Sequence, residues 1–499
     1  MITLQALFKN CDVRILKKDL PFFVTGLVCD SKQVKEGDLF VAVRGASQNG
    51  ASFIPEAIAR GARIIVSEED FFSDGKIIQI KIDDSRRVLA MLADRFYGEP
   101  SRKLKVIGIT GTNGKTTCSY LLEALFSEAQ KKVGVIGTIS YRVGERVIPA
   151  PNTTPGPLEV QSLLSQMVKE KIGYAVMEVS SHALDQKRVE TIRFDSALFT
   201  NLTQDHLDYH KTQEAYFLAK RRLFESLDPQ ATAVLNGDSP FVERIASVTQ
   251  ARVLRYALHH ADIRAESLEL TSRGTTFDAV TPQGKIGVRS GLIGVHNVYN
   301  ILGVIGAALA QGLSLSVIEE GIARFEGVPG RLEKIEAGQP FHVFVDFAHT
   351  EDALRQVLLS LRPLTRGRLL LLFGCGGNRD RSKRPKMAQA ASELSDFVVV
   401  TSDNPRKEDP QAILKEIEAG FPPAFQRYQL EEDRGKAIET ILAEAKEGDT
   451  VLIAGKGHEA YQIFRDRTVP FDDRQVVDEI LHHSRIAHSY GRALTSRGD

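Results

Sequence analysis

Short runs of consecutive apolar residues alternate along the chain with longer segments in which apolar residues recur every three or four positions. The runs at 105–110 (KVIGIT) and 369–373 (LLLLF) are apolar throughout, which is typical of strands buried on both faces of a parallel sheet. The segments at 115–130 and 296–312 have helical spacing. Strands that alternate with helices in this way predict an α/β protein built on parallel, doubly wound sheets.

Two clusters of glycine and proline divide this pattern. One is GEP at 98–100, and the other is GVPG at 327–330, after which a fresh alternation of strands and helices begins. A chain of 499 residues is also too long for a single hydrophobic core. We therefore expect three domains: a small N-terminal α/β domain over 1–100, a central domain with a parallel sheet over 101–330, and a C-terminal Rossmann-like domain over 331–499.

Composition and charge narrow the class of protein. Lys plus Arg and Asp plus Glu both total 64, so no net basic field attracts nucleic acid or an anionic membrane. No apolar run approaches the roughly 20 residues that span a bilayer, and the first residues lack a secretory pattern. The four cysteines form no CxxC pair. We expect a cytoplasmic monomer that neither binds nucleic acid nor inserts into a membrane.

The most informative segment is IGITGTNGKTT at 107–117. A strand runs into a glycine-bearing loop that opens a helix, so backbone N–H groups and the helix N-terminus can converge on phosphate oxygens. Lys115 would reach the β- and γ-phosphates, and the Thr116 hydroxyl would bind Mg²⁺. Ile109 departs from the general phosphate-loop pattern, and an incidental glycine turn is the alternative. We predict ATP binding by Gly111, Thr112, Asn113, Gly114, Lys115, Thr116 and Thr117.

The string GTNGKTT resembles the phosphate loop of the Mur ligases and of their relative folylpolyglutamate synthase. NTTPG (152–156), MEVSSHALDQKRV (177–189), NLTQDHLDYH (201–210) and AYFLAKRRLF (215–224) follow in the order and at spacings similar to those of Mur ligases that add the third peptide residue to UDP-N-acetylmuramoyl-L-alanyl-D-glutamate. The resemblance implies three domains and an ATP-dependent amide-bond ligase of peptidoglycan synthesis. In that family, ATP first converts a carboxylate into an acyl phosphate, which the incoming amine attacks.

The resemblance also implies a magnesium site. Glu178 and His206 match metal ligands of the family, and Thr116 would bind a second Mg²⁺. Lys220 matches a lysine that the family carries as a carbamate, although an unmodified lysine in an ordinary salt bridge is the alternative. His206 and His210 are four residues apart, a spacing that zinc sites also use, but no Cys or third His follows in that segment. The candidate catalytic residues are Lys115, Glu178, His206 and Lys220.

Other matched positions would hold the nucleotide-linked substrate. Hydroxyl and amide groups can bind sugar and peptide, and a guanidinium suits phosphate or carboxylate, although each residue alone could be a surface or helix-cap residue. In the first domain, Ser31 and the loop 45–50 resemble segments that bind uridine diphosphate, with a departure at Ala46 and Ser47. The muramoyl-peptide candidates are Thr153, Thr154, Ser180, Gln186 and Arg188, and Asn297 and Arg331 match nucleotide-binding motifs.

The C-terminal domain would select the amino acid that is added. DNPR at 403–406 follows a buried strand and resembles a motif of Mur ligases that add meso-diaminopimelate. An arginine fork can bind the second carboxylate of that amino acid bidentately, at roughly 1.5–3 kcal/mol, whereas lysine would leave Arg406 unpaired. A plain turn that caps the next helix is the alternative. The amino-acid candidates are Arg379, Asp403, Asn404, Pro405, Arg406, Gly455 and Glu459.

Three other functions remain to be compared with this hypothesis. A lysine-adding Mur ligase would lack an arginine at position 406, and folylpolyglutamate synthase would need neither an N-terminal UDP-binding domain nor DNPR. A nucleotide-binding scaffold without catalysis would have no reason to keep the four candidate catalytic residues together: Lys115, Glu178, His206 and Lys220. The glycines of FGCGGNRD do not have the spacing of a dinucleotide-binding motif, so we do not expect NAD.

Overall fold

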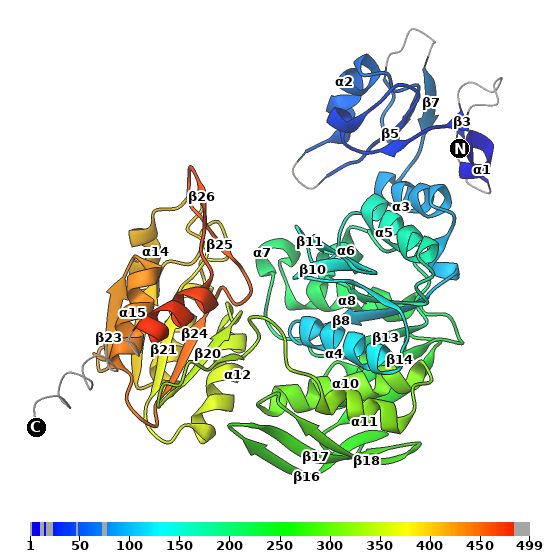
Figure 1. The fold of residues 1–499 in the computed structure, drawn as a ribbon. Coiled ribbons are helices and arrows are strands. Elements are labelled where there is room, and N and C mark those ends of the chain that lie inside the picture. The colour runs from blue at the N-terminus through cyan, green and yellow to red at the C-terminus, as the bar shows by residue number, and fades with distance from the viewer. Residues whose placement is uncertain (1, 10–13, 16–22, 46–47, 72–76, 484–499) are drawn as a thin grey trace, which may run out of the picture.

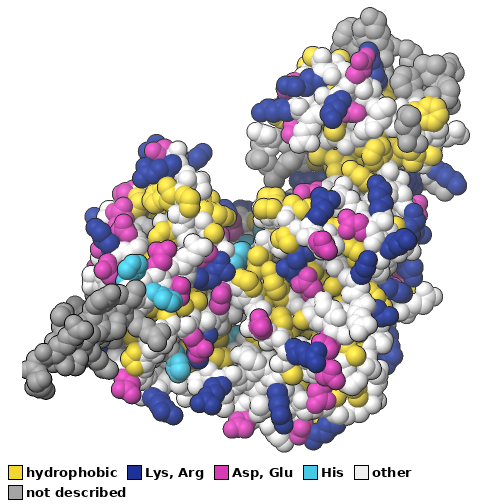
Figure 2. Space-filling view, in the orientation of Figure 1, with side chains coloured by type: hydrophobic (Ala, Val, Ile, Leu, Met, Phe, Trp, Pro, Cys, Tyr) yellow, Lys and Arg dark blue, Asp and Glu magenta, His cyan; other side chains and the backbone are white. Residues whose placement is uncertain are grey.

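The computed structural model describes residues 2–9, 14–15, 23–45, 48–71 and 77–483 of the chain. It confirms the α/β class and contains three α/β domains, with the N-terminal domain at one end of the central domain and the C-terminal domain at its side (Figure 1). The space-filling view shows an open notch between the N-terminal and C-terminal domains (Figure 2). Ala46 and Ser47, where the first-domain loop departs from the family pattern, lie outside the described residues.

The N-terminal domain is a five-stranded sheet in the order β2-β7-β6-β5-β4. Its middle strands β5 and β6 are buried at every position because helices cover both faces. Alternate side chains such as Leu39 and Val41 pack with those of α3, while Phe40 packs with α2. The elements are β1 (Ile2–Thr3), α1 (Leu4–Leu7), β2 (Arg14–Ile15), β3 (Phe23–Val24), β4 (Leu27–Val28), β5 (Leu39–Ala42), α2 (Ile54–Ala59), β6 (Ile64–Ser67), β7 (Ile78–Lys81) and α3 (Ser85–Phe96).

The central domain contains an eleven-stranded sheet in the order β11-β10-β9-β12-β8-β13-β14-β15-β16-β17-β18. Its middle strands are parallel and form two cores, one with α5 and α8 and the other with α4, α10 and α11. The strands are β8 (Lys105–Thr110), β9 (Val133–Ile136), β10 (Ser140–Val143), β11 (Arg146–Pro149), β12 (Tyr174–Glu178), β13 (Ser196–Phe199), β14 (Thr232–Asn236), β15 (Arg252–Ala257), β16 (Ile263–Thr271), β17 (Gly274–Thr281) and β18 (Gly284–Ser290). The helices are α4 (Lys115–Glu128), α5 (Pro157–Lys169), α6 (Ser181–Asp185), α7 (Leu207–His210), α8 (Gln213–Glu225), α9 (Val242–Ala246), α10 (Val295–Ala310) and α11 (Leu315–Ala323).

Antiparallel strands extend both edges of this central sheet, which the hydrophobic pattern did not predict. β10 and β11 form one edge, and β16, β17 and β18 form the other. Strand β18 alternates exposed and buried residues, because helix α11 covers one face and the other is open to solvent. Such half-polar strands lack the continuous apolar run that marks the parallel ones.

The C-terminal domain is a six-stranded sheet in the order β19-β20-β24-β21-β22-β23. The chain passes from β21 to β22 and β23 on one side, and β24 returns to the other side of β21. In open parallel sheets, ligands bind at such a reversal, outside the carboxyl ends of the strands. The elements are β19 (Glu333–Ile335), β20 (His342–Asp346), α12 (Glu351–Leu361), β21 (Leu369–Phe373), α13 (Lys383–Leu394), β22 (Phe397–Thr401), α14 (Pro410–Glu418), β23 (Tyr428–Glu431), α15 (Arg434–Glu444), β24 (Thr450–Ala454), β25 (Tyr461–Ile463) and β26 (Thr468–Pro470).

The long apolar helix α10 is a core element of the central domain. Twelve of its residues are buried, between α4 and the strands β13 to β16. Among the described residues, no helix combines the length and the apolar character that crossing a membrane requires.

Candidate active site

The phosphate loop connects β8 to α4, and two of its glycines are required by close neighbours. A Cβ on Gly111 would lie 1.8 Å from Thr200 Oγ1, and one on Gly114 would lie 2.3 Å from Asn300 Oδ1. Gly114 also has φ +88 and is the N-cap of α4. These neighbours leave no room for a side chain at either glycine. The bare backbone fits a loop whose N–H groups approach a triphosphate closely.

Two lysines share one acceptor in this loop. Lys115 Nζ donates to the carbonyl oxygens of Gly111 at 2.7 Å and Thr112 at 2.9 Å, and Lys220 Nζ donates to Gly111 O at 2.8 Å. Lys220 is fully buried on α8 and lies over the ring of Tyr216. Burial, with the neighbouring Lys115 charge, holds the pKa of Lys220 well below its usual value.

Glu178, the last residue of β12, lies fully buried beside the start of α4. Its carboxylate accepts hydrogen bonds from Thr116 Oγ1 at 3.1 Å, from the Thr138 hydroxyl at 2.8 Å and from the Thr138 backbone N–H at 3.1 Å. Carboxylate and hydroxyl oxygens are ligands that Mg²⁺ prefers, so this oxygen set fits the ion. Thr138 was not among the predicted residues, although its place after a strand is a signal that could have found it.

The predicted metal ligand His206 lies among aromatic rings, in edge contact with His182 and Tyr216. It is the N-cap of α7 and has a left-handed conformation (φ 54), and its Nε2 lies 3.4 Å from the Asp205 carboxylate. His210 instead bonds Ser181 Oγ through Nε2 at 2.9 Å, and burial lowers its pKa to about 4. Within the described residues, no three His, Cys, Asp or Glu side chains form a metal-binding group. The structure thus brings Thr116 into hydrogen-bond contact with Glu178, whereas His206 pairs with Asp205.

The residues predicted to hold the muramoyl peptide lie together beyond the end of β12. Thr154 Oγ1 donates to Glu178 O at 2.7 Å, and Ser180 N donates to Thr154 Oγ1 at 3.0 Å. Arg188 donates from Nη1 to Thr154 O and from Nη2 to Gln186 Oε1, both at 2.7 Å. Thr153 joins this group through the hydroxyl of Thr138, at 3.1 Å. Ser31 lies apart, in the N-terminal domain, where it donates to Glu56 at 2.7 Å.

Residues of the C-terminal domain contact the phosphate loop directly. Asp352, near the start of α12, accepts from Asn113 Nδ2 at 3.1 Å and from Thr203 Oγ1 at 2.9 Å. Arg331 Nη2 donates to Thr116 Oγ1 at 3.3 Å. Asn297 Nδ2 donates to Ile293 O, which precedes α10, and Asn297 Oδ1 accepts from Asn300 Nδ2 within that helix. Asp352 was not predicted, because an acidic residue in the first turn of a helix is equally expected as a partner of the helix dipole.

The DNPR loop lies where the C-terminal sheet reverses direction. Asn404 Nδ2 donates to Glu459 Oε2 at 2.8 Å, and Arg406 Nη1 donates to Gly377 O at 2.9 Å. Burial lowers the pKa of Arg406, as does the nearby Arg379 charge. Asp403 Oδ2 lies 2.8 Å from where a Gly455 Cβ would be.

The alternative that Asn404 and Pro405 simply cap the next helix does not hold. The N-cap of α14 is Asp409, whose side chain accepts from Gln411 N. Asn404 is almost fully buried and uses both ends of its amide within the loop cluster. Arg379 is exposed and bonds Asn378 O at 3.4 Å. The predicted amino-acid residues therefore come from three loops at one edge of the sheet.

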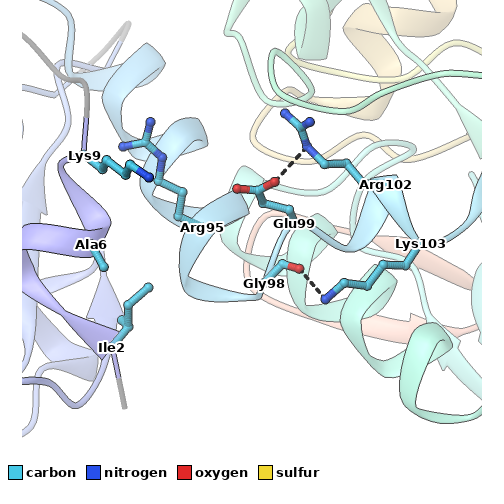
Figure 3. Close-up of a pocket in the computed structure, with 8 residues that line it drawn as sticks. All are labelled: Ile2, Ala6, Lys9, Arg95, Gly98, Glu99, Arg102 and Lys103. Carbon is cyan, nitrogen blue, oxygen red and sulfur yellow. Dashed lines mark hydrogen bonds and ion pairs between the residues drawn. The ribbon is translucent and has the colours of Figure 1, made fainter.

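A cavity of about 620 Å³ lies elsewhere, between α1 and the turn that follows α3 (Figure 3). Arg102 pairs with Glu99 there at 2.8 Å, and Lys103 Nζ donates to Gly98 O at 2.8 Å. None of the predicted site residues lines this cavity, so its size does not mark the reactive centre. Its lining residues are Ile2, Ala6, Lys9, Arg95, Gly98, Glu99, Arg102 and Lys103.

Comparison with known protein families shows to which family the chain belongs. The model of the Mur ligase family catalytic domain matches residues 23–97, the Mur ligase middle domain matches 109–308, and the Mur ligase glutamate ligase domain matches 330–457. A protein of Geobacillus thermodenitrificans (strain NG80-2) is 45% identical over 469 residues, which cover 93% of this chain and 96% of that protein. The chain belongs to the Mur ligases.

Relatives of this Mur ligase share one name. The Geobacillus protein is called UDP-N-acetylmuramoyl-L-alanyl-D-glutamate–2,6-diaminopimelate ligase, as is one of Gloeobacter violaceus (strain ATCC 29082 / PCC 7421), 46% identical over 93% of this chain and 94% of that protein. A solved structure of an enzyme with the same name is 33% identical, with a TM-score of 0.71 over 97% of this chain and 99% of that one.

More distant structures share the fold of this Mur ligase. The MurF ligase of Thermotoga maritima in complex with ADP is 21% identical, with a TM-score of 0.61 over 92% of this chain and 96% of that one. A folylpolyglutamate synthase of Mycobacterium tuberculosis, complexed with ADP and AMPPCP, covers 73% of this chain and 91% of its own, at 20% identity and a TM-score of 0.61.

Proposed function

We propose that this Mur ligase joins meso-2,6-diaminopimelate to UDP-N-acetylmuramoyl-L-alanyl-D-glutamate, with conversion of ATP to ADP and phosphate, in the cytoplasmic part of peptidoglycan synthesis. The relatives that carry this name align over more than nine tenths of the chain. The observation that carries the proposal is the grouping of Arg406, Asn404 and Glu459 at the carboxyl edge of the C-terminal sheet. A guanidinium for a carboxylate and a carboxylate for an ammonium match the two distal charges of diaminopimelate.

Activation of the D-glutamyl carboxylate would take place at the phosphate loop. A carboxylate approaching a triphosphate sets anion against anion, so the loop must supply positive charge. Among the described residues, the hydrogen-bond acceptors of Lys115 Nζ are two backbone carbonyls, and a bound phosphate would compete with them for the ammonium. The γ-phosphoryl group would then pass to the carboxylate, and attack of the diaminopimelate amine on the acyl phosphate would expel phosphate.

Magnesium would be held by oxygen ligands at the end of strand β12 and at the start of helix α4. When bound, the ion would neutralise phosphate charge and orient the transferring group. Thr116 and Glu178 are adjacent and would form the centre of the site. His206 would join when the C-terminal domain and α7 close on the substrates.

Lys220 is proposed to carry a carbamate. Carbamate formation joins an unprotonated amine to carbon dioxide and releases a proton, and the burial of Lys220 beside Lys115 favours the unprotonated form. The resulting anion would place negative charge next to the Gly111 carbonyl, where the amine now donates. Lys220 would thereby change from a second cation into a group that can hold Mg²⁺.

The remaining predicted residues are assigned to the nucleotide-linked peptide. Ser31 would bind the uridine diphosphate in the N-terminal domain, and Arg188 with its hydroxyl neighbours Thr154 and Ser180 would hold the muramoyl peptide. The domain boundaries are placed near residues 100 and 330, and the protein is taken to act as a monomer.

The test is an assay of ADP release with purified protein, ATP, Mg²⁺ and UDP-N-acetylmuramoyl-L-Ala-D-Glu. Each candidate amino acid is supplied in turn: meso-diaminopimelate, L-lysine and L-glutamate. Release that depends on meso-diaminopimelate supports the proposal. Release with L-lysine alone would assign the lysine-adding activity, and no ADP release with any of the three amino acids would favour a scaffold.

A further inference from the structure

A hairpin that the hydrophobic pattern did not predict packs against the DNPR loop. It consists of β25 and β26, paired antiparallel so that Gln462 lies opposite Val469. Figure 1 shows it at the outer end of the C-terminal domain, beyond β24. The hairpin's outer strand is largely exposed, whereas Gln462 on the inner strand is only 5% exposed.

Three hydrogen bonds join this hairpin to the DNPR loop, one for each polar residue of the motif. Gln462 Nε2 donates to the carbonyl oxygen of Asp403 at 2.9 Å. The backbone N–H of Ile463 donates to Asn404 Oδ1, also at 2.9 Å. The backbone N–H of Arg406 donates to Ile463 O at 2.9 Å. The loop is thus fixed at three points along its length.

Arg406 needs this support because its backbone has a left-handed conformation, with φ 54. A non-glycine residue persists there when the surrounding structure determines it, and such residues cluster at binding sites. The bond from Arg406 N to Ile463 O holds that conformation, and the guanidinium then reaches Gly377 O at 2.9 Å. A displaced hairpin would let the guanidinium turn away from this place.

Gln462 is the side chain through which the hairpin holds the start of the loop. Burying an amide is unfavourable unless it is hydrogen-bonded, and the Asp403 carbonyl is the partner to which its Nε2 donates. We propose that Gln462 is a positioning residue: it fixes the Asp403–Asn404 peptide so that Asn404 and Arg406 meet the distal end of the amino-acid substrate. This inference rests on the proposed function, because it concerns how that substrate is selected.

The experiment compares Gln462→Met, which keeps the length and loses the amide, with Gln475→Met. Gln475 is an exposed residue thirteen positions further on, so it receives the same chemical change outside the buried hairpin contact. The apparent KM for meso-diaminopimelate should rise about tenfold in Gln462→Met, the fold-change equivalent to one lost buried hydrogen bond. The KM for ATP and kcat at saturating diaminopimelate should stay unchanged, and the preference for diaminopimelate over L-lysine should fall.

The outcomes are distinct. Should wild-type protein not use meso-diaminopimelate, the proposed function fails and this inference with it. If wild type uses it and Gln462→Met matches Gln475→Met, the inference alone fails. Equal changes in every KM, or a loss of kcat with a lower Tm, would show a merely structural role and also overturn it. If Gln462→Met does not fold, Gln462→Asn, which stays polar but is too short to reach Asp403 O, must show the same selective rise.

Discussion

Lys115 and Lys220 donate to the same carbonyl oxygen, that of Gly111, at 2.7 and 2.8 Å. Two amines on one acceptor in a buried place repel one another when both are protonated, and burial lowers the pKa of each. A bound triphosphate would attract the Lys115 ammonium away from Gly111 O. A carbamate on Lys220 would be an anion, so that Lys220 would attract Lys115 instead of repelling it. The pair therefore predicts different responses to loss of each lysine.

Lys220→Ala should be nearly inactive in ADP release and partly recover when short carboxylic acids are added, because the acid can occupy the place of the carbamate. Lys115→Ala is the matched control: it should also be inactive, but an added anion cannot replace a cation. Recovery is measured as initial rate against the concentration of acetate or formate. Full activity of Lys220→Ala without any acid, or equal recovery of both variants, would remove Lys220 from the magnesium site.

Arg406→Ala should raise the apparent KM for meso-diaminopimelate by about 10- to 100-fold, the loss expected for a charge-assisted hydrogen bond to a carboxylate. The KM for ATP should change little, since Arg406 lies in the C-terminal domain among the loops after β21 and β22. Lys407→Ala, the removal of an exposed neighbouring cation, serves as the control. An equal rise in both KM values would contradict the assignment of Arg406 to the amino acid.

Glu178→Gln should raise the Mg²⁺ concentration needed for half-maximal activity about tenfold or more, because one negative charge leaves an oxygen site for a hard cation. The shape of the side chain is kept, so its bonds to the Thr116 and Thr138 hydroxyls can re-form in part. ADP release is followed across a magnesium titration. An unchanged magnesium requirement would show that Glu178 serves only the packing between β12 and α4.

Gly111→Ala should abolish ATP binding, since the new Cβ would lie 1.8 Å from Thr200 Oγ1 and force the loop to move. Gly173→Ala adds the same methyl group where no atom lies within 4 Å, and should bind ATP as the wild type does. Binding is measured by calorimetry with a non-hydrolysable ATP analogue. Equal affinity of the two variants for the ATP analogue would show that the phosphate loop can move to accommodate a side chain at position 111.

Asp473→Asn should lower the free energy of unfolding by about 3–5 kcal/mol, the cost of leaving a buried charge without its partner. Arg434 and Asp473 are both inaccessible to solvent and joined by two bonds of 2.7 Å. Arg434 also donates to Ser402 O and Ala454 O, at the ends of β22 and β24. Asp466→Asn, in an exposed ion pair, should have little effect. The free energies of unfolding of the two variants are measured by denaturant unfolding monitored by circular dichroism.

Local patterns predicted those parts of the site that are continuous in sequence. The strand, glycine loop and helix at 105–128 are encoded by neighbouring residues, and the DNPR loop follows an apolar strand directly. A continuous apolar run suffices to identify a strand buried on both faces, so strands such as β8 and β21 were accessible to prediction. The edge strands β10, β11 and β16 to β18 were not, because their half-polar pattern resembles that of a surface loop.

The amino-acid sequence by itself determined the α/β class, the phosphate loop and the family resemblance of the site motifs, since each depends on contiguous residues. The tertiary structure decided which distant groups meet. Lys220 reaches Gly111 across 109 positions, Asp352 reaches Asn113 across 239, and Gln462 reaches Asp403 across 59. Such contacts are set by how strands order themselves and how domains pack, because no local spacing specifies which side chains face one another once the sheets have formed.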